Sequence, residues 1–365
     1  VPRVRDKAVR LVSGGEEVAI SLQCPRFVFE TGTVGGTWPT RIKGNLSRGE
    51  LLEASYPAQA IGTNGQLEVR LLLQWSAKEG VLRKWAEFRL NDAPAPLLLK
   101  EVILEQADLP GQKPQLEGSG VQSYPAFWRG FFGGVEFPVA ATRVEGERLI
   151  VAHRPGWTLR KGEWRQSRKA VFGVAPEGNE RRQFARYITA HRPKPAGLHV
   201  NYNSWWTSPA PFYKENDILT LMGEFEQQLF KSYGVSFDTF CIDMGWAEPR
   251  SVWEIKKDLF PEGFSRIQSS AARMGSSLGL WISPTACYHD ALNPDWARTN
   301  LETFRPQSGS GPGAQMCCLG GLRYATAFRA RLVDLVRRYG IRHVKLDGYC
   351  LECPETGHGH APGAL

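Results

Sequence analysis

Up to about residue 195, apolar residues occur in short runs that alternate with polar ones, and clusters of Gly, Pro, Asn and Asp separate the runs. A period of two is typical of half-buried strands, and many short strands with hardly any amphipathic helix predict a large antiparallel β-sandwich. The runs are "EEVAISLQC", "QLEVRLLLQW", "KWAEFRL", "PLLLKEVILEQ", "ERLIVAHR" and "KAVFGVAP". We therefore predict that residues 1–195 form a β-sandwich domain.

After "HRPKPAG" the pattern changes, because strand-like segments now alternate with helical stripes. The strand-like segments are "LHVNYNSWW", "FDTFCIDMGW", "SLGLWISP" and "IRHVKLDGYC". The three stripes are Ile218, Met222, Phe225, Leu229 and Tyr233, stopped by Gly234; Phe264, Ile267, Ala271 and Met274; and Phe328, Leu332, Leu335 and Tyr339, stopped by Gly340. This alternation predicts βα units with a parallel sheet, in either a barrel or a doubly wound arrangement. A complete eightfold barrel needs roughly 250 residues, so if the domain is a barrel, about half of it lies beyond this chain.

Charge and composition exclude some classes of partner. The net charge of +8 is spread over 45 Lys and Arg and 37 Asp and Glu without a long block of one sign, which favours a solvated surface over a nucleic-acid interface. No apolar run is long enough to cross a membrane, and the first residues lack the hydrophobic region of a signal peptide, so a cytoplasmic and an exported location are equally compatible with the sequence. The 12 Trp and 18 Phe offer flat faces that suit sugar rings, although most will be core residues.

The last predicted strand carries two charges on one face. Side chains of a strand alternate between faces, so Lys345 and Asp347 share one side while Val344 and Leu346 share the other. In a barrel the two charges would point inward at the carboxyl end of the strand, where barrel enzymes keep their active sites. The same alternation predicts one cavity lined by Asp243, Trp281, Lys345 and Asp347, with Trp205 and Trp246 near its rim.

Taken in order, four segments resemble the first four strands of the melibiase-type α-galactosidases of glycoside hydrolase families 27 and 36. They are "VNYNSWW", "FCIDMGW", "DLFPEGFSRIQSSAARMGSSLGLWISP" and "YGIRHVKLDGYC", and upstream "FFGGVEFPVAATRVEGERLIVAHRPGWTL" resembles the sandwich domain of the family 36 branch. The resemblance implies a β-sandwich over residues 1–195 and the first half of a catalytic (β/α)8 TIM-type barrel, with about four βα units, over residues 196–365. It also implies retaining hydrolysis of terminal α-linked galactose or a related sugar. Transglycosylation of the raffinose-synthase type, or a non-catalytic carbohydrate-binding homologue, are the alternatives.

The resemblance assigns roles by position. Asp347 matches the nucleophile that forms a glycosyl-enzyme intermediate. Lys345 matches a lysine that hydrogen-bonds a sugar hydroxyl, and Asp243 matches the first of two aspartates that hold hydroxyls on the far side of the ring. Trp205 and Trp281 match aromatic positions that pack against the sugar. Trp246 is interpreted as a packing neighbour.

Two departures from the family pattern limit these assignments. Met244 stands where the family usually has a second aspartate, which weakens the expectation of a strict galactose preference. In the family, the general acid/base comes from a strand well after the nucleophile, and neither Glu352 nor Glu355 fits that role, so we expect no hydrolysis by residues 1–365 alone. The two-carboxylate mechanism needs neither a metal nor an organic cofactor, and none is expected. In this family the sandwich often helps oligomers to form, so a homo-oligomer of the full-length protein is expected from the resemblance alone.

The end of the chain is rich in thiols and imidazoles, with Cys350, Cys353, His358 and His360 in one short segment. Structural zinc sites usually separate their ligand pairs by wider loops. We therefore favour loop residues near a sugar subsite over a zinc site. The neighbouring Cys317 and Cys318 are interpreted as a loop feature rather than a redox centre.

Overall fold

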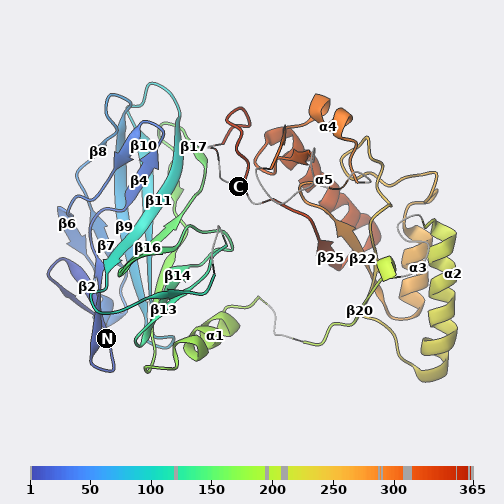
Figure 1. The fold of residues 1–365 in the computed structure, drawn as a ribbon, viewed down its shortest axis with the longest axis horizontal. Helices are drawn as coiled ribbons and strands as arrows, with labels where there is room; N and C mark the ends of the chain where they lie inside the picture. The colour runs from blue at the N-terminus through green and yellow to red at the C-terminus, as the bar shows by residue number, and fades with distance from the viewer. Residues whose placement is uncertain are drawn as a thin grey trace. The chain divides into compact units, whose positions relative to one another are not determined.

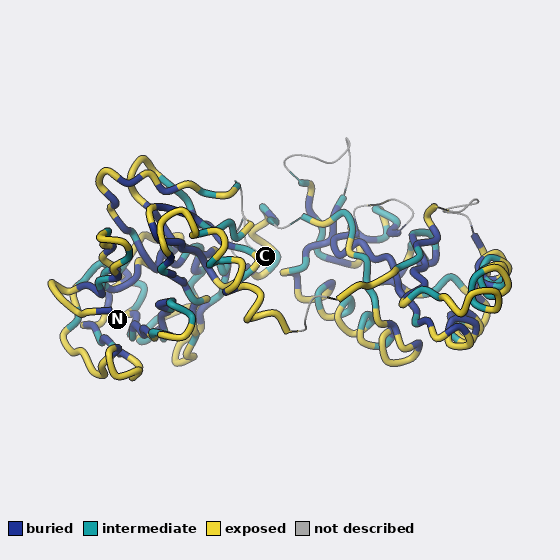
Figure 2. Tube along the Cα trace, turned by 90° about the horizontal axis from the view of Figure 1, so that it is seen from below, coloured by how far each residue is buried: buried dark blue, intermediate teal, exposed yellow. Residues whose placement is uncertain are grey.

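The computed structural model describes residues 2–118, 122–193, 197–206, 213–286, 288, 291–306, 315–350, 352–360 and 362. The chain divides into two compact units, the first comprising Val1–Pro195 and His360–Leu365 and the second Ala196–Gly359. Each unit has its own buried interior, which Figure 2 traces in dark blue. Among the described residues, no helix is both long and apolar enough to cross a bilayer.

The first unit is built from antiparallel sheets (Figure 1). A three-stranded sheet contains β1 (Arg3–Arg5), β2 (Ala8–Ser13) and β3 (Glu16–Ser21). A ten-stranded sheet contains β12 (Gln115–Leu116), β13 (Ala126–Trp128), β14 (Phe131–Val135), β19 (Ala170–Val174), β10 (Val81–Asn91), β9 (Gln66–Ser76), β7 (Leu52–Ser55) and β6 (Arg41–Lys43), with β18 (Trp164–Gln166) on β10 and β8 (Gln59–Ala60) on β9. A six-stranded sheet contains β15 (Arg143–Glu145), β16 (Arg148–His153), β11 (Leu97–Asp108), β4 (Arg26–Phe29) and β5 (Gly32–Val34), with β17 (Trp157–Leu159) on β11.

Alternating apolar residues of these sheets form one large core. In β9, for example, Leu67, Val69, Leu71 and Leu73 are buried, and they belong to the same apolar cluster as residues of the six-stranded sheet. Burial of apolar surface contributes about 25 cal/mol per Å2, so this shared interior is the main stabilising contribution to the unit. The antiparallel sheets predicted from the alternation are confirmed.

A helix lies where the sequence pattern indicated none. Helix α1 (Glu180–Ala190) follows the last strand of the unit and packs Phe184 and Tyr187 against Phe132. Only Tyr187 of its residues is buried, and four of its 11 residues are charged, so the helix carries too narrow an apolar stripe to be predicted from the sequence. The helix covers β14 because its few aromatic residues find partners there.

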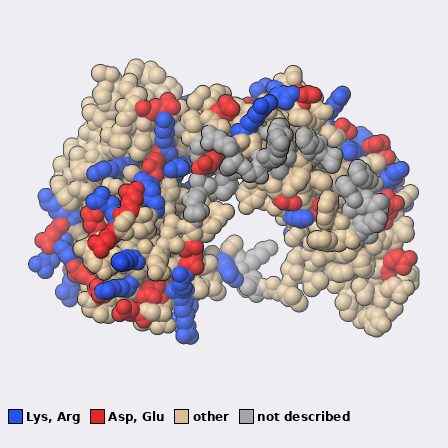
Figure 3. All heavy atoms as spheres, in the orientation of Figure 1, with Lys and Arg blue, Asp and Glu red and all other residues tan. Residues whose placement is uncertain are grey.

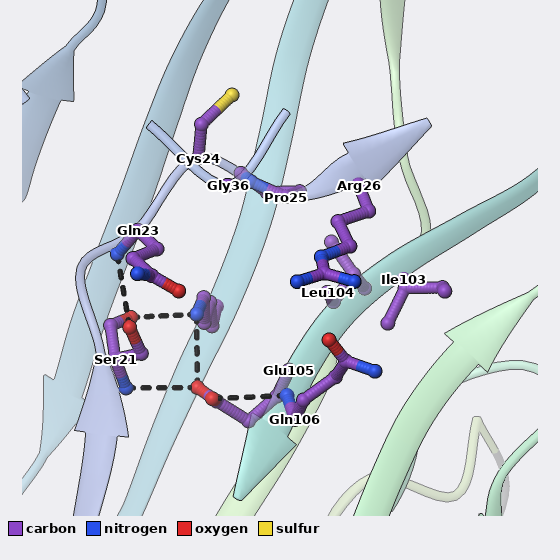
Figure 4. Close-up of a pocket in the computed structure, with 11 residues that line it drawn as sticks. Ser21, Gln23, Cys24, Pro25, Arg26, Gly36, Ile103, Leu104, Glu105 and Gln106 are labelled. Carbon is purple, nitrogen blue, oxygen red and sulfur yellow. Dashed lines mark hydrogen bonds and ion pairs between the residues drawn. The ribbon is translucent and has the colours of Figure 1, made fainter. Parts of the chain in front are cut away.

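A buried ion pair ties three strands of the first unit together. Lys84 of β10 donates to Glu105 of β11 at 2.9 Å and to the carbonyl oxygen of Ser21 in β3 at 2.7 Å, and both charged side chains are 1% exposed. The Glu105 carboxylate also accepts the Ser21 backbone N–H (Figure 4). Removing either charge would leave the other buried and uncompensated, so the pair fixes how these strands are placed.

Surface charge is mixed, as the composition indicated. On the face drawn in Figure 3, Lys and Arg side chains are interspersed with Asp and Glu over the first unit. Ion pairs of the first unit include Arg10 with Glu17 and Arg148 with Asp108.

The second unit contains a parallel sheet flanked by helices. The strands β20 (Asn201–Asn203), β21 (Thr239–Ile242), β22 (Ser277–Ile282) and β25 (His343–Leu346) lie side by side in this order, all parallel. The connections contain η2 (Ser204–Trp206), α2 (Glu215–Phe225), the π-helical η3 (Glu226–Lys231), α3 (Ser265–Arg273), α4 (Pro294–Asn300) and α5 (Leu322–Tyr339), with a hairpin of β23 (Thr303–Phe304) and β24 (Met316–Cys317) before α5. The predicted sequence of antiparallel sheets followed by a parallel sheet with helices is therefore confirmed.

Two of the three predicted helical stripes are confirmed, and the first needs a correction. Helix α5 ends at Gly340, which adopts the left-handed conformation with φ 60°. In the first stripe, Tyr233 is 75% exposed and Phe230 packs against the core instead. The π-helical turn η3 explains this shift, because its wider turn rotates the residues that follow relative to the α-helical period.

We predict that burial of His153 makes the first unit sensitive to mild acid. Its ring is 3% exposed and accepts the Arg168 backbone N–H at 3.3 Å. Burial, and then the charge of Arg168, lowers the pKa of His153 to about 3. Below about pH 6.5 this histidine binds a proton in the unfolded chain, whereas in the folded chain it stays neutral until about pH 3. The free energy of unfolding therefore falls as pH drops from about 6.5 towards 3, by at most about 1.4 kcal/mol per pH unit.

His153→Gln retains a hydrogen-bond acceptor but cannot titrate. The free energy of unfolding, followed by denaturant melts between pH 7 and 4, should therefore fall less steeply in this variant than in the unsubstituted chain. Equal slopes would show that His153 does not contribute to the acid sensitivity.

Candidate functional site

The carboxyl ends of the four parallel strands all carry polar residues. Asn203 is the last residue of β20, while Asp243, Ser283 and Asp347 follow β21, β22 and β25. Parallel strands end at the same edge of their sheet, so these side chains gather there. This edge is the candidate functional site.

Asp243 lies at the centre of a hydrogen-bond network. The residue is 1% exposed, and its Oδ2 accepts from Lys345 Nζ at 2.9 Å and from Asn203 Nδ2 at 2.7 Å. Its Oδ1 accepts the Met244 backbone N–H at 2.9 Å, and its own backbone N–H donates to Ser204 Oγ. A buried carboxylate is tolerated only when it is compensated in this way. With about four acceptor positions on a carboxylate, these three donors leave about one on Oδ1.

Lys345 spans the face of the sheet. It is opposite Trp281 of β22 in the strand register, yet its ammonium group reaches Asp243 after β21, two strands away. The intervening strand has Gly279, where an added Cβ would lie 3.1 Å from the Cβ of His343 and 3.2 Å from that of Cys241. The Lys345 side chain remains 36% exposed, so its ammonium group has donors left for a ligand.

Asp347 is held by aromatic donors at the start of a loop. Trp281 Nε1 donates to its Oδ2 at 3.1 Å, and the Tyr288 hydroxyl lies 3.4 Å from Oδ1. Its backbone N–H continues the pairing with β22 by donating to Ile282 O at 3.1 Å. The next carbonyl, that of Gly348, accepts from Ser283 Oγ at 2.7 Å. Both the side chain and the backbone of Asp347 are thus fixed, while the residue stays half-buried.

The tryptophans have different environments. Trp281 is 2% exposed, and its ring meets that of Tyr288 edge to face at 5.3 Å. Trp246 is a core residue, as expected, because it is fully buried, packs on Phe264 and donates to the backbone oxygen of Trp281. Trp205 is 40% exposed, and its backbone N–H donates to Asn203 Oδ1 at 2.8 Å.

Burial keeps two other titratable groups near this edge uncharged. The pKa of Cys241 is raised to about 12 by burial and by the negative charge of Asp243, against the opposing effect of Lys345. Burial likewise raises the pKa of Tyr213, whose hydroxyl donates to the backbone oxygen of Met244 at 2.8 Å. Both groups therefore stay neutral at physiological pH, and the inward cysteine is not a thiolate nucleophile.

The structure thus joins the residues singled out in the sequence into two hydrogen-bonded pairs. Lys345 bonds to Asp243, Trp281 bonds to Asp347, and Trp205 connects to the first pair through Asn203. Sequence reasoning missed Asn203 and Tyr288. Asn203 shares a strand face with Asn201, so alternation could have identified it, whereas Tyr288 lies in a loop without a periodic signal.

Two features define the class of protein to which the chain is compared. Antiparallel sheets precede a parallel βα sheet, and carboxylates lie at the carboxyl edge of that parallel sheet. No protein-family model matches the sequence, and a search of curated proteins found no match. Solved structures do match. The α-galactosidase from Lactobacillus brevis has 14% identity and a TM-score of 0.59, covering 95% of this chain and 58% of its own.

The GH36 α-galactosidase AgaB from Geobacillus stearothermophilus has 14% identity and a TM-score of 0.62, covering 95% of this chain and 66% of its own. A variant of AgaA from the same organism, in complex with 1-deoxygalactonojirimycin, has 15% identity and a TM-score of 0.57, with 89% and 55% covered. The chain therefore has the fold of GH36 α-galactosidases and spans less than two thirds of the length of these proteins. The resemblance seen in the sequence is confirmed for the fold.

We predict that Lys345→Met destabilises the second unit. The substitution removes the positive partner of a buried carboxylate, and we expect a loss of roughly 2–3 kcal/mol in the free energy of unfolding. This is less than for a fully buried pair because the lysine side chain is 36% exposed. Denaturant melts followed by tryptophan fluorescence measure the loss.

Two variants separate the ion pair from general damage. Adding Asp243→Asn to Lys345→Met removes the uncompensated charge and should recover at least half of the loss. Arg342→Met, which removes an exposed cation from the same segment, should leave stability unchanged. An equal loss in the single and double variants would contradict the ion-pair account.

Proposed function

We propose that this chain carries the sandwich and the first four βα units of a (β/α)8 barrel from a retaining glycoside hydrolase that acts on terminal α-linked galactose or a related sugar. The observation that carries the proposal is the half-buried carboxylate of Asp347, oriented at the carboxyl end of β25 beside the Lys345–Asp243 pair. The shared fold with GH36 α-galactosidases supports it. Structures of AgaA variants with raffinose and with stachyose indicate the kind of substrate to test first.

In this proposal Asp347 attacks the anomeric carbon. Trp281 occupies Oδ2 with a hydrogen bond of 3.1 Å, while the contact of Tyr288 with Oδ1 is longer, at 3.4 Å. Oδ1 is therefore the oxygen freer to form the bond to carbon. Attack converts the carboxylate into a glycosyl ester and releases the leaving group, and water then hydrolyses that ester with overall retention.

Lys345 and Asp243 would bind hydroxyl groups of the sugar. The ammonium group of Lys345 is partly exposed and has N–H donors available for a ligand. Oδ1 of Asp243 has an acceptor position left. Trp205 offers an exposed aromatic face, whereas Trp281 acts chiefly by orienting Asp347. Met244 packs against the apolar core and supplies no side-chain hydrogen bond to the sugar, which loosens selection between galactose and related rings.

We predict that Asp347→Asn abolishes reaction with α-galactosyl fluoride. Fluoride leaves without protonation, so this donor reports the attack step even where no general acid is assigned. Residues 1–365 should release about one fluoride per chain in a burst, measured with a fluoride electrode, and the variant should slow this burst at least about 1000-fold. The control Glu355→Gln neutralises an exposed carboxylate in the following loop and should keep the burst.

The outcome also separates the alternatives. Galactose binding without any burst would favour the non-catalytic carbohydrate-binding homologue. A burst that Asp347→Asn leaves intact would remove Asp347 from the mechanism. Adding a sugar acceptor after the burst distinguishes transglycosylation, because the acceptor would then carry the galactosyl group.

A further inference from the structure

Outside the polar sheet edge, two thiols and two imidazoles converge. The donor atoms of Cys318, Cys353, His358 and His360 all lie within 4.8 Å of one another. We propose that this cluster is a structural zinc site that fastens the loop after β25 to the start of helix α5. The proposal does not rest on the proposed function, and it departs from the expectation that the chain holds no metal.

One ligand sits on a rigid support. Cys318 directly follows β24, its backbone N–H donates to Glu302 O at 2.9 Å, and its carbonyl accepts the N–H of Gly321 at 3.0 Å. The Glu302 carboxylate in turn accepts the backbone N–H groups of Arg323 and Tyr324 in the first turn of α5. The thiol of Cys318 is therefore placed by a hairpin and a helix end that are already bonded together.

The other ligands come from the loop that begins after Asp347. Cys353 Sγ lies 3.3 Å from His358 Nδ1, and Cys353 is fully buried. His360 is 7% exposed and follows two residues after His358, so the loop itself brings it to the cluster. By contrast, the Cys350 thiol is directed to the backbone oxygen of Glu352 at 3.2 Å and is not part of the cluster.

The donor set and its size suit zinc. Two thiolates and two imidazoles make the Cys2His2 set, and soft sulfur ligands favour Zn2+ over Mg2+ or Ca2+. In a tetrahedral site with zinc bonds of about 2.0–2.3 Å, the ligand atoms lie about 3.3–3.8 Å apart. The cluster needs only a small contraction from 4.8 Å to reach that geometry.

Cys318 removes the objection that the ligand pairs at the end of the chain are too close together in sequence for a zinc site. A Cys pair and a His-x-His pair within one short segment close a tetrahedron poorly, but the structure replaces the nearby Cys350 with a cysteine from a distant hairpin. A structural zinc bridges parts of the chain that are far apart in sequence, and this arrangement does so. The result is a clamp on the loop that starts at Asp347.

The test measures zinc in the purified chain. Residues 1–365, prepared under reducing conditions without chelator, should contain about one Zn2+ per chain by elemental mass spectrometry. Cys318→Ser and Cys353→Ser should each lose at least about 90% of it. The matched controls Cys317→Ser and Cys350→Ser change neighbouring thiols outside the cluster and should keep it.

Cobalt tests the geometry without relying on activity. Co2+ added to the stripped chain should give thiolate charge-transfer bands and the intense visible bands of a tetrahedral ion. His360→Ala should weaken the visible bands if His360 is the fourth ligand, while Cys318→Ser should remove the charge-transfer contribution of one thiolate.

A second measurement covers variants that fail to fold. Chelation of the unsubstituted chain should lower its melting temperature, and Zn2+ but not Mg2+ should restore it. Wild-type chain that holds no more zinc than the double variant Cys318→Ser/Cys353→Ser would overturn the proposal. So would a Cys318–Cys353 disulfide in chain purified under reducing conditions without chelator, found by peptide mapping, or equal zinc loss in Cys317→Ser and Cys318→Ser.

Discussion

The ion pair between Lys345 and Asp243 is the interaction on which the rest of the site depends. A charge on a core strand is tolerated only when it is compensated, and each of these two residues compensates the other across β22. The pair fixes which face of the sheet is polar. Strand alternation then places Asp347 on that same face at the end of β25, where Trp281 orients it. Gly279 of the middle strand β22 has no side chain, and a Cβ there would crowd the Cβ atoms of Cys241 and His343.

Much of this arrangement could be predicted from periodicity, because strands obey simple geometric rules. Alternation alone placed Lys345 and Asp347 together, and the Gly340 stop of α5 followed from its sequence. The sequence could not predict what depends on local irregularity. The π-helical turn η3 leaves Tyr233 exposed to solvent, and α1 buries only Tyr187, so its apolar stripe is too narrow to predict a helix.

Contacts between segments that are distant in the sequence could not be predicted either. Cys318 lies far from Cys353 in the sequence, so spacing alone pairs Cys353 with Cys350. In the structure Cys318 joins Cys353, and Cys350 lies outside the cluster. Tyr288 was missed for the same reason, since only folding brings its hydroxyl to Asp347. In both cases a long loop supplies the residue, and no period marks it.

The polar edge and the cysteine-histidine cluster meet in one stretch of chain. The loop that contains Cys353 and His358 starts at Asp347, whose neighbour Gly348 is already held by Ser283 and Thr285. A zinc ion bound at the far end of this loop would limit how far Asp347, the proposed nucleophile, can move. The proposed active site and the proposed zinc site are therefore connected through the backbone that follows Asp347.

The position of a trapped sugar tests whether Asp347 is the attacking carboxylate. A ring-fluorinated α-galactosyl fluoride forms the glycosyl ester and hydrolyses it slowly, so the labelled chain can be digested and its peptides sequenced by mass spectrometry. We expect one galactosyl-derived group, attached to Asp347. A label on another carboxylate, or an unlabelled chain that nevertheless binds the sugar, would contradict it.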